Sequence, residues 1–332
     1  MKLLFVGDWA PVALRREKIG EGIAIGNLEC AFADGEVTSE KAYSSVLPRS
    51  CMDNIPSGGF AALSVANNHV NDAANFRETY AELIRLFPSI QFFGTSDKPY
   101  AVFESNNLES DNQTIVIGCL EPCRSRGDYL FKQEDVTALI RKLRSASFAS
   151  NQTIKQSANQ TILIYPHWGM EGEYTRYPSP AQLKLARKWI DAGADGVIGN
   201  HSHVPQGKEL YKGKPIYYSL GNFDFPLGET KAVPESFERM VVRCDAGCWS
   251  EEYDSPRTGA AVAAVSAIIS DGWTIWKWAR TIGRFNIEKN TASWRLRLER
   301  NFLKTFPKYV AWQFLPKIIL FRIASLWLCC KK

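Results

Sequence analysis

The stretch DAGADGVIGNHSHVPQ, residues 191–206, decides the fold class of this chain. Gly193 is typical of the end of a helix, and the apolar run 196–199 after it predicts a short buried strand. A helix that leads directly into a buried strand is the recurring unit of α/β proteins. The polar run Asn200-His201-Ser202-His203 follows at once. The stretch therefore predicts an α/β domain with a polar site at the end of a strand.

The residues on either side continue this alternation. A helix is predicted over 76–87, where five apolar residues share one face. A second helix begins at Ser179, because Ser179-Pro180-Ala181-Gln182 is typical of a capping box. After residue 223 the pattern becomes strand-rich, through 239–244 and 261–278. Short apolar runs predict further strands over 2–6, 22–28, 61–66, 90–93, 114–120 and 161–166.

Candidate metal ligands follow these apolar runs. They include all four histidines of the chain, and they are Asp8, Glu29, Asn67-Asn68-His69, His167 and His201-Ser202-His203. Residues just beyond the carboxyl ends of strands in an open α/β sheet meet in one crevice, so we expect these side chains to converge. Carboxylate, amide oxygen and imidazole together suit Mn, Fe or Zn better than thiolate chemistry.

Each cluster alone has a simpler explanation. Asp8 is also a candidate helix cap, and Asn67-Asn68 is a candidate turn pair. Taken alone, His69 is better explained as a core histidine with satisfied hydrogen bonds. His201-Ser202-His203 is more informative, because alternate residues of an extended segment share one side and can bracket a metal ion.

The motifs at these positions resemble those of a known family. They are Gly7-Asp8, Asn27-Leu28-Glu29, residues 66–72, His167-Trp168-Gly169 with Glu173-Tyr174, and the run 191–206 with its continuation 218–223. Through them, residues 3–225 resemble the bacterial capsule-synthesis CapA family, which is associated with poly-γ-glutamate and belongs to the calcineurin-like metallophosphoesterase superfamily. The resemblance implies a layered α-β-β-α sandwich, with mixed sheets flanked by helices.

The resemblance also implies roles for individual residues. His69 stands where the superfamily has the histidine that protonates the leaving group, and Asp72 is placed to orient its imidazole. Ala10 stands where the superfamily often has a second ligand of its first motif. The implied metal ligands are Asp8, Glu29, Asn68, His167, His201 and His203, with Glu29 where a bridging Asp is usual.

Two functions from different classes follow as expectations. The first is a metal-dependent phosphoesterase or phosphodiesterase, in which one or two Mn, Fe or Zn ions activate water and His69 acts as general acid. Its substrate would be a phosphate-containing small molecule or polymer intermediate. The alternative is a non-catalytic component of capsule assembly, which binds poly-γ-glutamate, polysaccharide or a partner through the same cleft.

Length and composition are consistent with a globular protein. The chain has 332 residues, of which 45% are hydrophobic and 23% charged, and this excludes a disordered or fibrous chain. We predict a metallophosphoesterase domain over 1–285 and a basic, apolar helical tail over 286–332. The start of the chain shows no secretory leader, so we expect the eight cysteines to be reduced and to act mainly as small buried hydrophobes.

The tail carries most of the positive charge. Residues 276–332 contain 13 Lys or Arg and 2 Asp or Glu, a net charge of +11, which leaves −6 for residues 1–275. Its apolar end is shorter than the roughly 20 residues of a spanning helix, and Trp312 and Trp327 suit a helix that lies on an anionic membrane. A helix that completes the protein's own core or a dimer interface is the alternative. We therefore expect residues 309–332 to contact an anionic membrane surface or a protein partner. We also expect the protein to be cytoplasmic and peripheral to the inner face of the membrane. Nucleic-acid binding is not expected, because no known binding motif accompanies the charge.

Overall fold

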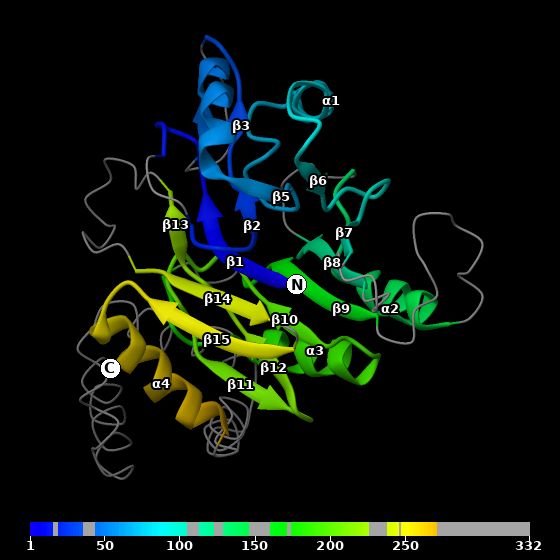
Figure 1. Cartoon of the computed structure of the whole chain (residues 1–332), viewed down its shortest axis with the longest axis vertical. Helices are drawn as coiled ribbons and strands as arrows, with labels where there is room; N and C mark the ends of the chain where they lie inside the picture. Colours follow the sequence, from blue (N-terminus) through cyan, green and yellow to red (C-terminus); the bar gives the residue numbers. More distant parts are fainter. Residues whose placement is uncertain are drawn as a thin grey trace, which may run out of the picture. The chain divides into compact units, whose positions relative to one another are not determined.

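Two mixed β-sheets form the centre of the computed structural model (Figure 1). The chain divides into two units, residues 1–276 and 277–332. The structure describes residues 1–15, 19–35, 44–104, 113–122, 129–145, 160–170, 174–225, 238–245 and 247–270, all in the first unit. The predicted tail 286–332 lies outside the described residues.

The first sheet has the strand order β15-β14-β1-β2-β5-β6, with β13 also beside β1. The strands β1, β2, β5 and β6 run parallel, and so does β13 to β1, whereas β14 and β15 are antiparallel. The bounds are β1 Lys2–Trp9, β2 Ile23–Leu28, β5 Phe60–Ser64, β6 Gln91–Phe93, β13 Asn222–Asp224, β14 Met240–Asp245 and β15 Cys248–Tyr253.

The second sheet has the order β11-β12-β10-β9-β8-β7. Its four central strands are parallel, and β7 and β11 are antiparallel at the edges. The bounds are β7 Tyr100–Glu104, β8 Gln113–Leu120, β9 Thr161–His167, β10 Gly196–Ile198, β11 Lys208–Tyr211 and β12 Lys214–Tyr217. A small separate pair is formed by β3 Ala31–Phe32 and β4 Val46–Leu47.

Three apolar clusters define the layers. One lies between the sheets and joins Phe5 and Phe93 of the first sheet to Leu163 of the second. Another packs the 3-10 helix η1 (Arg49–Gly58) and α1 (Phe76–Leu86) on the outer face of the first sheet. The third packs α2 (Val136–Arg144), α3 (Pro180–Asp191) and α4 (Pro256–Ser270) on the outer face of the second sheet. This confirms the predicted layered arrangement of mixed sheets flanked by helices.

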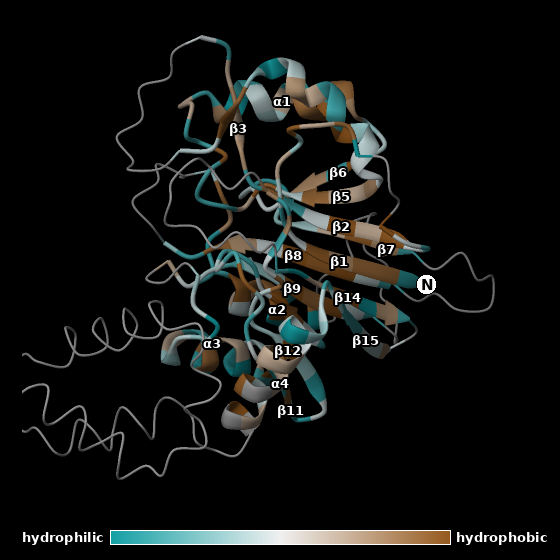
Figure 2. Ribbon diagram, turned by 90° about the vertical axis from the view of Figure 1, so that its left-hand side faces the viewer, coloured by the Kyte–Doolittle hydropathy of each residue, from teal (hydrophilic) through white to brown (hydrophobic). Residues whose placement is uncertain are grey.

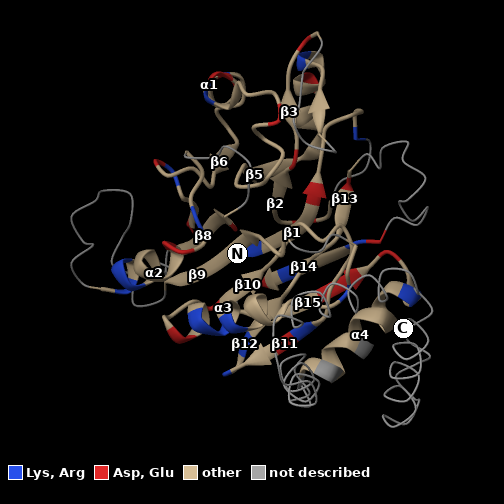
Figure 3. Cartoon of the chain, turned by 180° about the vertical axis from the view of Figure 1, so that it is seen from behind, with Lys and Arg blue, Asp and Glu red and all other residues tan. Residues whose placement is uncertain are grey.

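The distribution of side chains fits these layers. The central strands are predominantly apolar, whereas α1 and α3 carry both apolar and polar residues (Figure 2). Charged residues lie on helices, on loops and on the strands β11, β14 and β15, whereas β2, β5, β8, β9 and β10 contain no Lys, Arg, Asp or Glu (Figure 3). Each fully buried large apolar side chain contributes about 1.5–3 kcal/mol to stability, so the layers are held together without any bound ion.

Most predicted elements are confirmed, with bounds shifted by a few residues. The predicted helix over 76–87 is α1, and the helix predicted to begin at Ser179 is α3. Ser179 accepts a hydrogen bond from the Gln182 backbone, and the Gln182 side chain accepts one from the Ser179 backbone, so the predicted capping box is present. The predicted strands over 2–6, 22–28, 61–66, 90–93, 114–120, 161–166, 196–199 and 239–244 correspond to β1, β2, β5, β6, β8, β9, β10 and β14.

The strand-rich prediction for 261–278 is wrong over its described part, which is the helix α4. Ser255 Oγ accepts a hydrogen bond from the Thr258 backbone 3.2 Å away, and Pro256 occupies the first turn, where proline is tolerated. The segment is also rich in alanine, the best helix former. Because α4 is apolar on nearly all sides, its sequence lacks the 3.6-residue period that would have distinguished it from a strand.

A close contact between two glycines places β1 beside the segment before β13. A Cβ added to Gly7 would lie 1.7 Å from the Gly221 carbonyl oxygen, so only glycine fits there. The neighbouring Asp8 amide donates a hydrogen bond to that carbonyl. The contact holds the residue that follows Gly7 in a fixed position at the end of the sheet.

The cysteines of the described residues are free thiols. Cys30, Cys119 and Cys244 are buried, Cys51 is half-buried and Cys248 is exposed, and burial raises the pKa of the Cys119 thiol. The buried cysteines therefore behave as the small hydrophobes that were predicted. Within the described part of the chain, no helix is both long and apolar enough to cross a membrane.

Candidate metal centre

The eight side chains predicted as site residues lie together where strands of both sheets end. Asp8 is in β1, Glu29 follows β2, and Asn68, His69 and Asp72 follow β5. From the second sheet, His167 ends β9, and His201 and His203 follow β10. All are buried except Asn68, which is half-buried. The structure thus brings together every residue singled out from the sequence, and their roles as ligands or acid remain proposals.

Two groups of donor atoms share one carboxylate. Glu29, His167 and His201 form one group, and Asp8, Glu29 and His203 form the other, with the donor atoms of each group within 4.8 Å of one another. Glu29 therefore stands between two candidate ion positions, which is the place of a bridging ligand.

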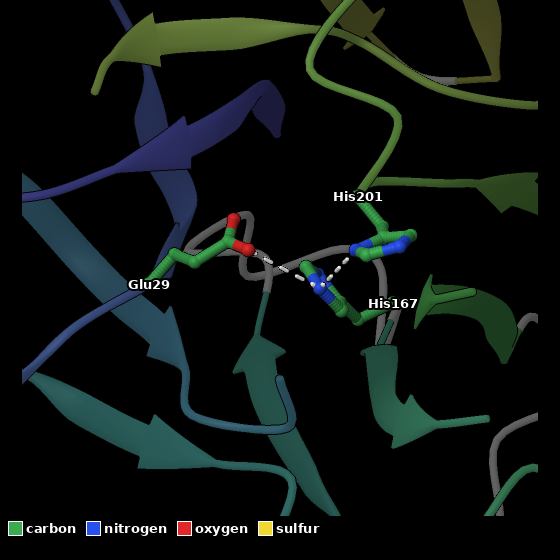
Figure 4. Close-up of side chains that lie close together, drawn as sticks. All are labelled: Glu29, His167 and His201. Atoms are coloured by element: carbon green, nitrogen blue, oxygen red, sulfur yellow. Dashed lines mark hydrogen bonds and ion pairs between the residues drawn. The ribbon is translucent and has the colours of Figure 1, made fainter. Parts of the chain in front are cut away.

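The first group is the more tightly built of the two. His167 Nε2 lies 3.3 Å from Glu29 Oε1 and 3.0 Å from His201 Nδ1, and Figure 4 shows His167 between the other two side chains. Asn68 Oδ1 approaches the same His167 nitrogen at 2.6 Å. One donor atom from each of three other segments thus lies within 3.3 Å of His167 Nε2.

In the second group, a neighbouring amide orients the imidazole. His203 Nδ1 lies 2.8 Å from Asn222 Oδ1, and an amide oxygen only accepts, so Nδ1 carries the proton. The other nitrogen, Nε2, faces Glu29 Oε1 at 4.0 Å. The His203 ring is stacked between Tyr174 and Phe225, with centroid distances of 5.5 and 5.0 Å. Asn222 thus leaves the Nε2 lone pair of His203 available to a metal ion.

His69 and Asp72 form a hydrogen-bonded pair at the edge of these groups. His69 Nδ1 lies 2.6 Å from Asp72 Oδ2, and the same oxygen accepts a hydrogen bond from the Ser45 backbone at 2.8 Å. His69 Nε2 points toward Glu29 Oε1, 4.0 Å away. The pair therefore presents one imidazole nitrogen to the centre and fixes the other on a carboxylate.

The backbone at His201 and His203 differs from the extended segment predicted for it. Their φ angles are +98° and +58°, in a region that residues other than glycine rarely adopt. The two rings reach the same side through a tight turn, and not through the alternation of a strand. Such local strain costs on the order of 1–3 kcal/mol per residue and is typical of functional sites.

Asn27 and Asn67 also belong to the site. The sequence placed Asn67 only in a cluster of candidate ligands or a turn, and Asn27 only in the motif that ends at Glu29. Asn27 Nδ2 lies 2.8 Å from Asp8 Oδ1 and 3.3 Å from Glu29 Oε2. Asn67 Nδ2 donates to Asn27 Oδ1 at 3.1 Å. The spacing of Asn27 and Glu29 could have revealed the first of these, because residues two apart near the end of a strand share one side.

Burial keeps other titratable groups near the centre neutral. Burial, reinforced by the charge of Asp8, raises the pKa of Tyr165 well above its usual value. Burial, reinforced by Glu29, likewise raises the pKa of the Cys30 thiol. Neither group adds negative charge, so the charge of the centre comes from its carboxylates.

The donor set fits divalent metal ions. Asp8 and Glu29 are fully buried, and their oxygens lie within 4.8 Å of each other in the second group. Two buried carboxylates so close together repel unless a cation lies with them. Carboxylate, amide oxygen and imidazole are ligands that suit Mn, Fe and Zn. The residues present can therefore hold one or two such ions.

A comparison with known protein families fits this geometry. Residues 9–226, more than half of the chain, match the family described as bacterial capsule synthesis protein PGA_cap. The chain belongs to this family. The match includes the two donor groups almost completely, since Asp8 alone lies before its first residue.

Individual members of the capsule synthesis family are moderately similar. The chain is 30% identical over 202 residues to the capsule biosynthesis protein CapA of Bacillus anthracis, across 57% of this chain and 46% of that protein. It is 46% identical over 70 residues to the PGA biosynthesis protein CapA of Bacillus subtilis, a match that covers 21% of this chain and 18% of that protein. A probable polyglutamine synthesis accessory protein of Mycobacterium tuberculosis is 27% identical over 230 residues, which cover 64% of this chain and 58% of that protein. The chain thus spans less than half the length of the two Bacillus relatives.

Solved structures are more distant. A novel phosphatase from Mycoplasma pneumoniae has a TM-score of 0.46 and 11% identity, across 78% of this chain and 96% of that one. A hypothetical protein from Thermus thermophilus has a TM-score of 0.44 and 17% identity, across 76% and 98%.

Proposed function

We propose that this member of the capsule synthesis family is a metal-dependent phosphoesterase or phosphodiesterase. The observation that carries the proposal is the pair of donor groups that share Glu29 beside the His69–Asp72 pair. Asp8, Glu29 and His203 would hold one ion, and Glu29, Asn68, His167 and His201 the other. Mn, Fe or Zn bound there would supply Lewis-acid activation of water and of a phosphate ester.

The protein's own contribution to the reaction is to orient groups and donate a proton. Asp72 fixes His69 Nδ1, so that Nε2 faces the centre and can donate a proton to the departing oxygen. The Ser45 backbone in turn holds Asp72 in place. No serine or cysteine nucleophile is needed, and the substrate we propose is a phosphate-containing small molecule or polymer intermediate.

Metal-dependent turnover tests this proposal. The purified full-length chain, freed of metal and then supplied with Mn²⁺, Fe²⁺ or Zn²⁺, is expected to hydrolyse 4-nitrophenyl phosphate or bis(4-nitrophenyl) phosphate. A chelator should abolish the activity, because the ions supply the activation of water. Release of nitrophenolate is the measurement, with the metal-free chain as the control.

A second candidate is a non-catalytic role in the assembly of a capsule polymer, with the same residues binding polymer or partner. Ala10 favours it, because it stands where the superfamily often has a further ligand and cannot itself ligate an ion of the Asp8–Glu29–His203 group. The description of one relative as an accessory protein points the same way. Absence of both bound metal and ester hydrolysis in the assay above would support this candidate and contradict the enzyme.

We further propose that residues 309–332 contact an anionic membrane surface, or else a protein partner, on the cytoplasmic side. The net charge of +11 over 276–332 and the tryptophans near the end support this proposal. The full chain is expected to sediment with vesicles that contain phosphatidylglycerol, and a chain that lacks 309–332 is not. Equal sedimentation of the two chains would contradict the membrane contact.

A further inference from the structure

The side-chain amides of Asn27 and Asn67 form a chain through the centre. Both residues are 1% exposed, so their polar atoms depend on partners within the protein. Asn67 Oδ1 accepts hydrogen bonds from the backbone of His69 and of Val70, both at 3.0 Å. Its Nδ2 donates to the Leu28 carbonyl at 2.7 Å and to Asn27 Oδ1 at 3.1 Å.

Backbone groups determine which way each amide faces. A backbone N–H only donates and a carbonyl only accepts, so the Asn67 oxygen must face His69 and Val70, and its nitrogen must face Leu28. The oxygen of Asn27 then receives the Asn67 amide, and the nitrogen of Asn27 is directed at the carboxylates of Asp8 and Glu29. The same nitrogen also lies 3.2 Å from His167 Nδ1, so two carboxylates and one imidazole of the centre lie within hydrogen-bond distance of it.

We infer that Asn27 is a positioning residue, which holds Asp8 and Glu29 at the separation that the metal centre needs. Its amide also offsets the repulsion between the two buried carboxylates before any ion binds. Through Asn67, the same chain links these carboxylates to the backbone of His69. The inference rests on the proposed metal centre, because it assigns Asn27 a role toward those ligands.

Metal affinity tests the inference. In Asn27→Leu, which removes the donor at similar volume, Mn²⁺ should bind about 10–100-fold more weakly to the full chain, the loss typical of a removed partner of a metal ligand. Asn54→Leu is the matched control, because Asn54 donates one hydrogen bond to the Pro11 carbonyl and contacts neither carboxylate. The control should bind within about twofold of the wild type. Calorimetric titration with Mn²⁺ measures the affinity of the wild type, of Asn27→Leu and of Asn54→Leu.

A second variant keeps the test valid if Asn27→Leu fails to fold. It also distinguishes a role in positioning the carboxylates from a general contribution to stability. Asn27→Ser keeps one O–H donor in a smaller side chain, and it should bind Mn²⁺ with intermediate affinity. The visible absorption of Co²⁺ bound in its place should differ from that of the wild type, whereas Asn54→Ser should leave the spectrum unchanged. Wild-type Mn²⁺ affinity and Co²⁺ spectrum in a folded Asn27→Ser would overturn the inference. Failure of the wild-type chain itself to bind Mn²⁺ would overturn the metal centre, and the inference with it.

Discussion

His69→Ala is expected to lower kcat for phenyl phosphate by about 10²–10⁴-fold, the usual contribution of a general acid. Phenolate is a poor leaving group, so the departing oxygen needs the proton that His69 Nε2 would donate. Asp72 and the Ser45 backbone remain in place in this variant, but the imidazole that they orient is gone. The measurement is the initial rate of phosphate release at saturating Mn²⁺.

The choice of leaving group provides the control. With 4-nitrophenyl phosphate, whose leaving group departs readily without protonation, the same variant should lose much less activity. Metal content should equal that of the wild type, because His69 belongs to neither donor group. Equal rates of wild type and His69→Ala on phenyl phosphate would remove His69 from the mechanism.

Glu29→Gln is expected to weaken the binding of both metal ions by more than about 100-fold, because a shared ligand is a larger loss than a partner of a ligand. Asp8→Asn should affect mainly one ion, since Asp8 belongs to one group only. The metal content of the purified, Mn²⁺-loaded chain, measured by elemental analysis, distinguishes the two variants. Retention of a full complement of metal in Glu29→Gln would show that Glu29 does not bridge.

The stability of the metal-free chain shows whether such a loss is specific. Glu29→Gln removes one of two neighbouring buried carboxylates, so the repulsion between them falls and the metal-free Tm should not decrease. Glu209→Gln is the matched control, because Glu209 is also a buried carboxylate but pairs with Arg187 on the second sheet. The Tm of Glu209→Gln should fall, whereas its metal content should equal that of the wild type.

The position of the site was predictable from the sequence, because it depends on chain order alone. Five of the apolar runs, 2–6, 22–28, 61–66, 161–166 and 196–199, are followed by a candidate ligand. Strands that run parallel bring such ends to one edge of a sheet. The helix α3 was also predictable, since its capping box lies within four consecutive residues. The pairing of β13 and β14 with β1 was not, because it joins residues more than 200 positions apart in the chain.

The finer geometry of the site required the structure. Positive φ angles at His201 and His203 contradict the preferences of histidine, and surrounding contacts impose them. The role inferred for Asn27 depends on which way its amide faces. The backbone groups of Leu28 and His69 decide that by fixing the amide of Asn67. The uniformly apolar α4 was mistaken for strand, because only its packing against β11 and β15 shows which form it takes.

The origin of the ligands in two layers has a consequence for folding. One donor group combines one carboxylate from the first sheet with two imidazoles from the second, and the other combines two carboxylates with one imidazole. Both groups therefore draw on both sheets. A metal ion would then bind only after the two sheets have packed together, and a bound ion would link ligands of one sheet to ligands of the other. At a free concentration of 100 times Kd, one such ion adds about 2.7 kcal/mol against unfolding. A bound ion would thus add to the stability that the apolar contacts between the two sheets already provide.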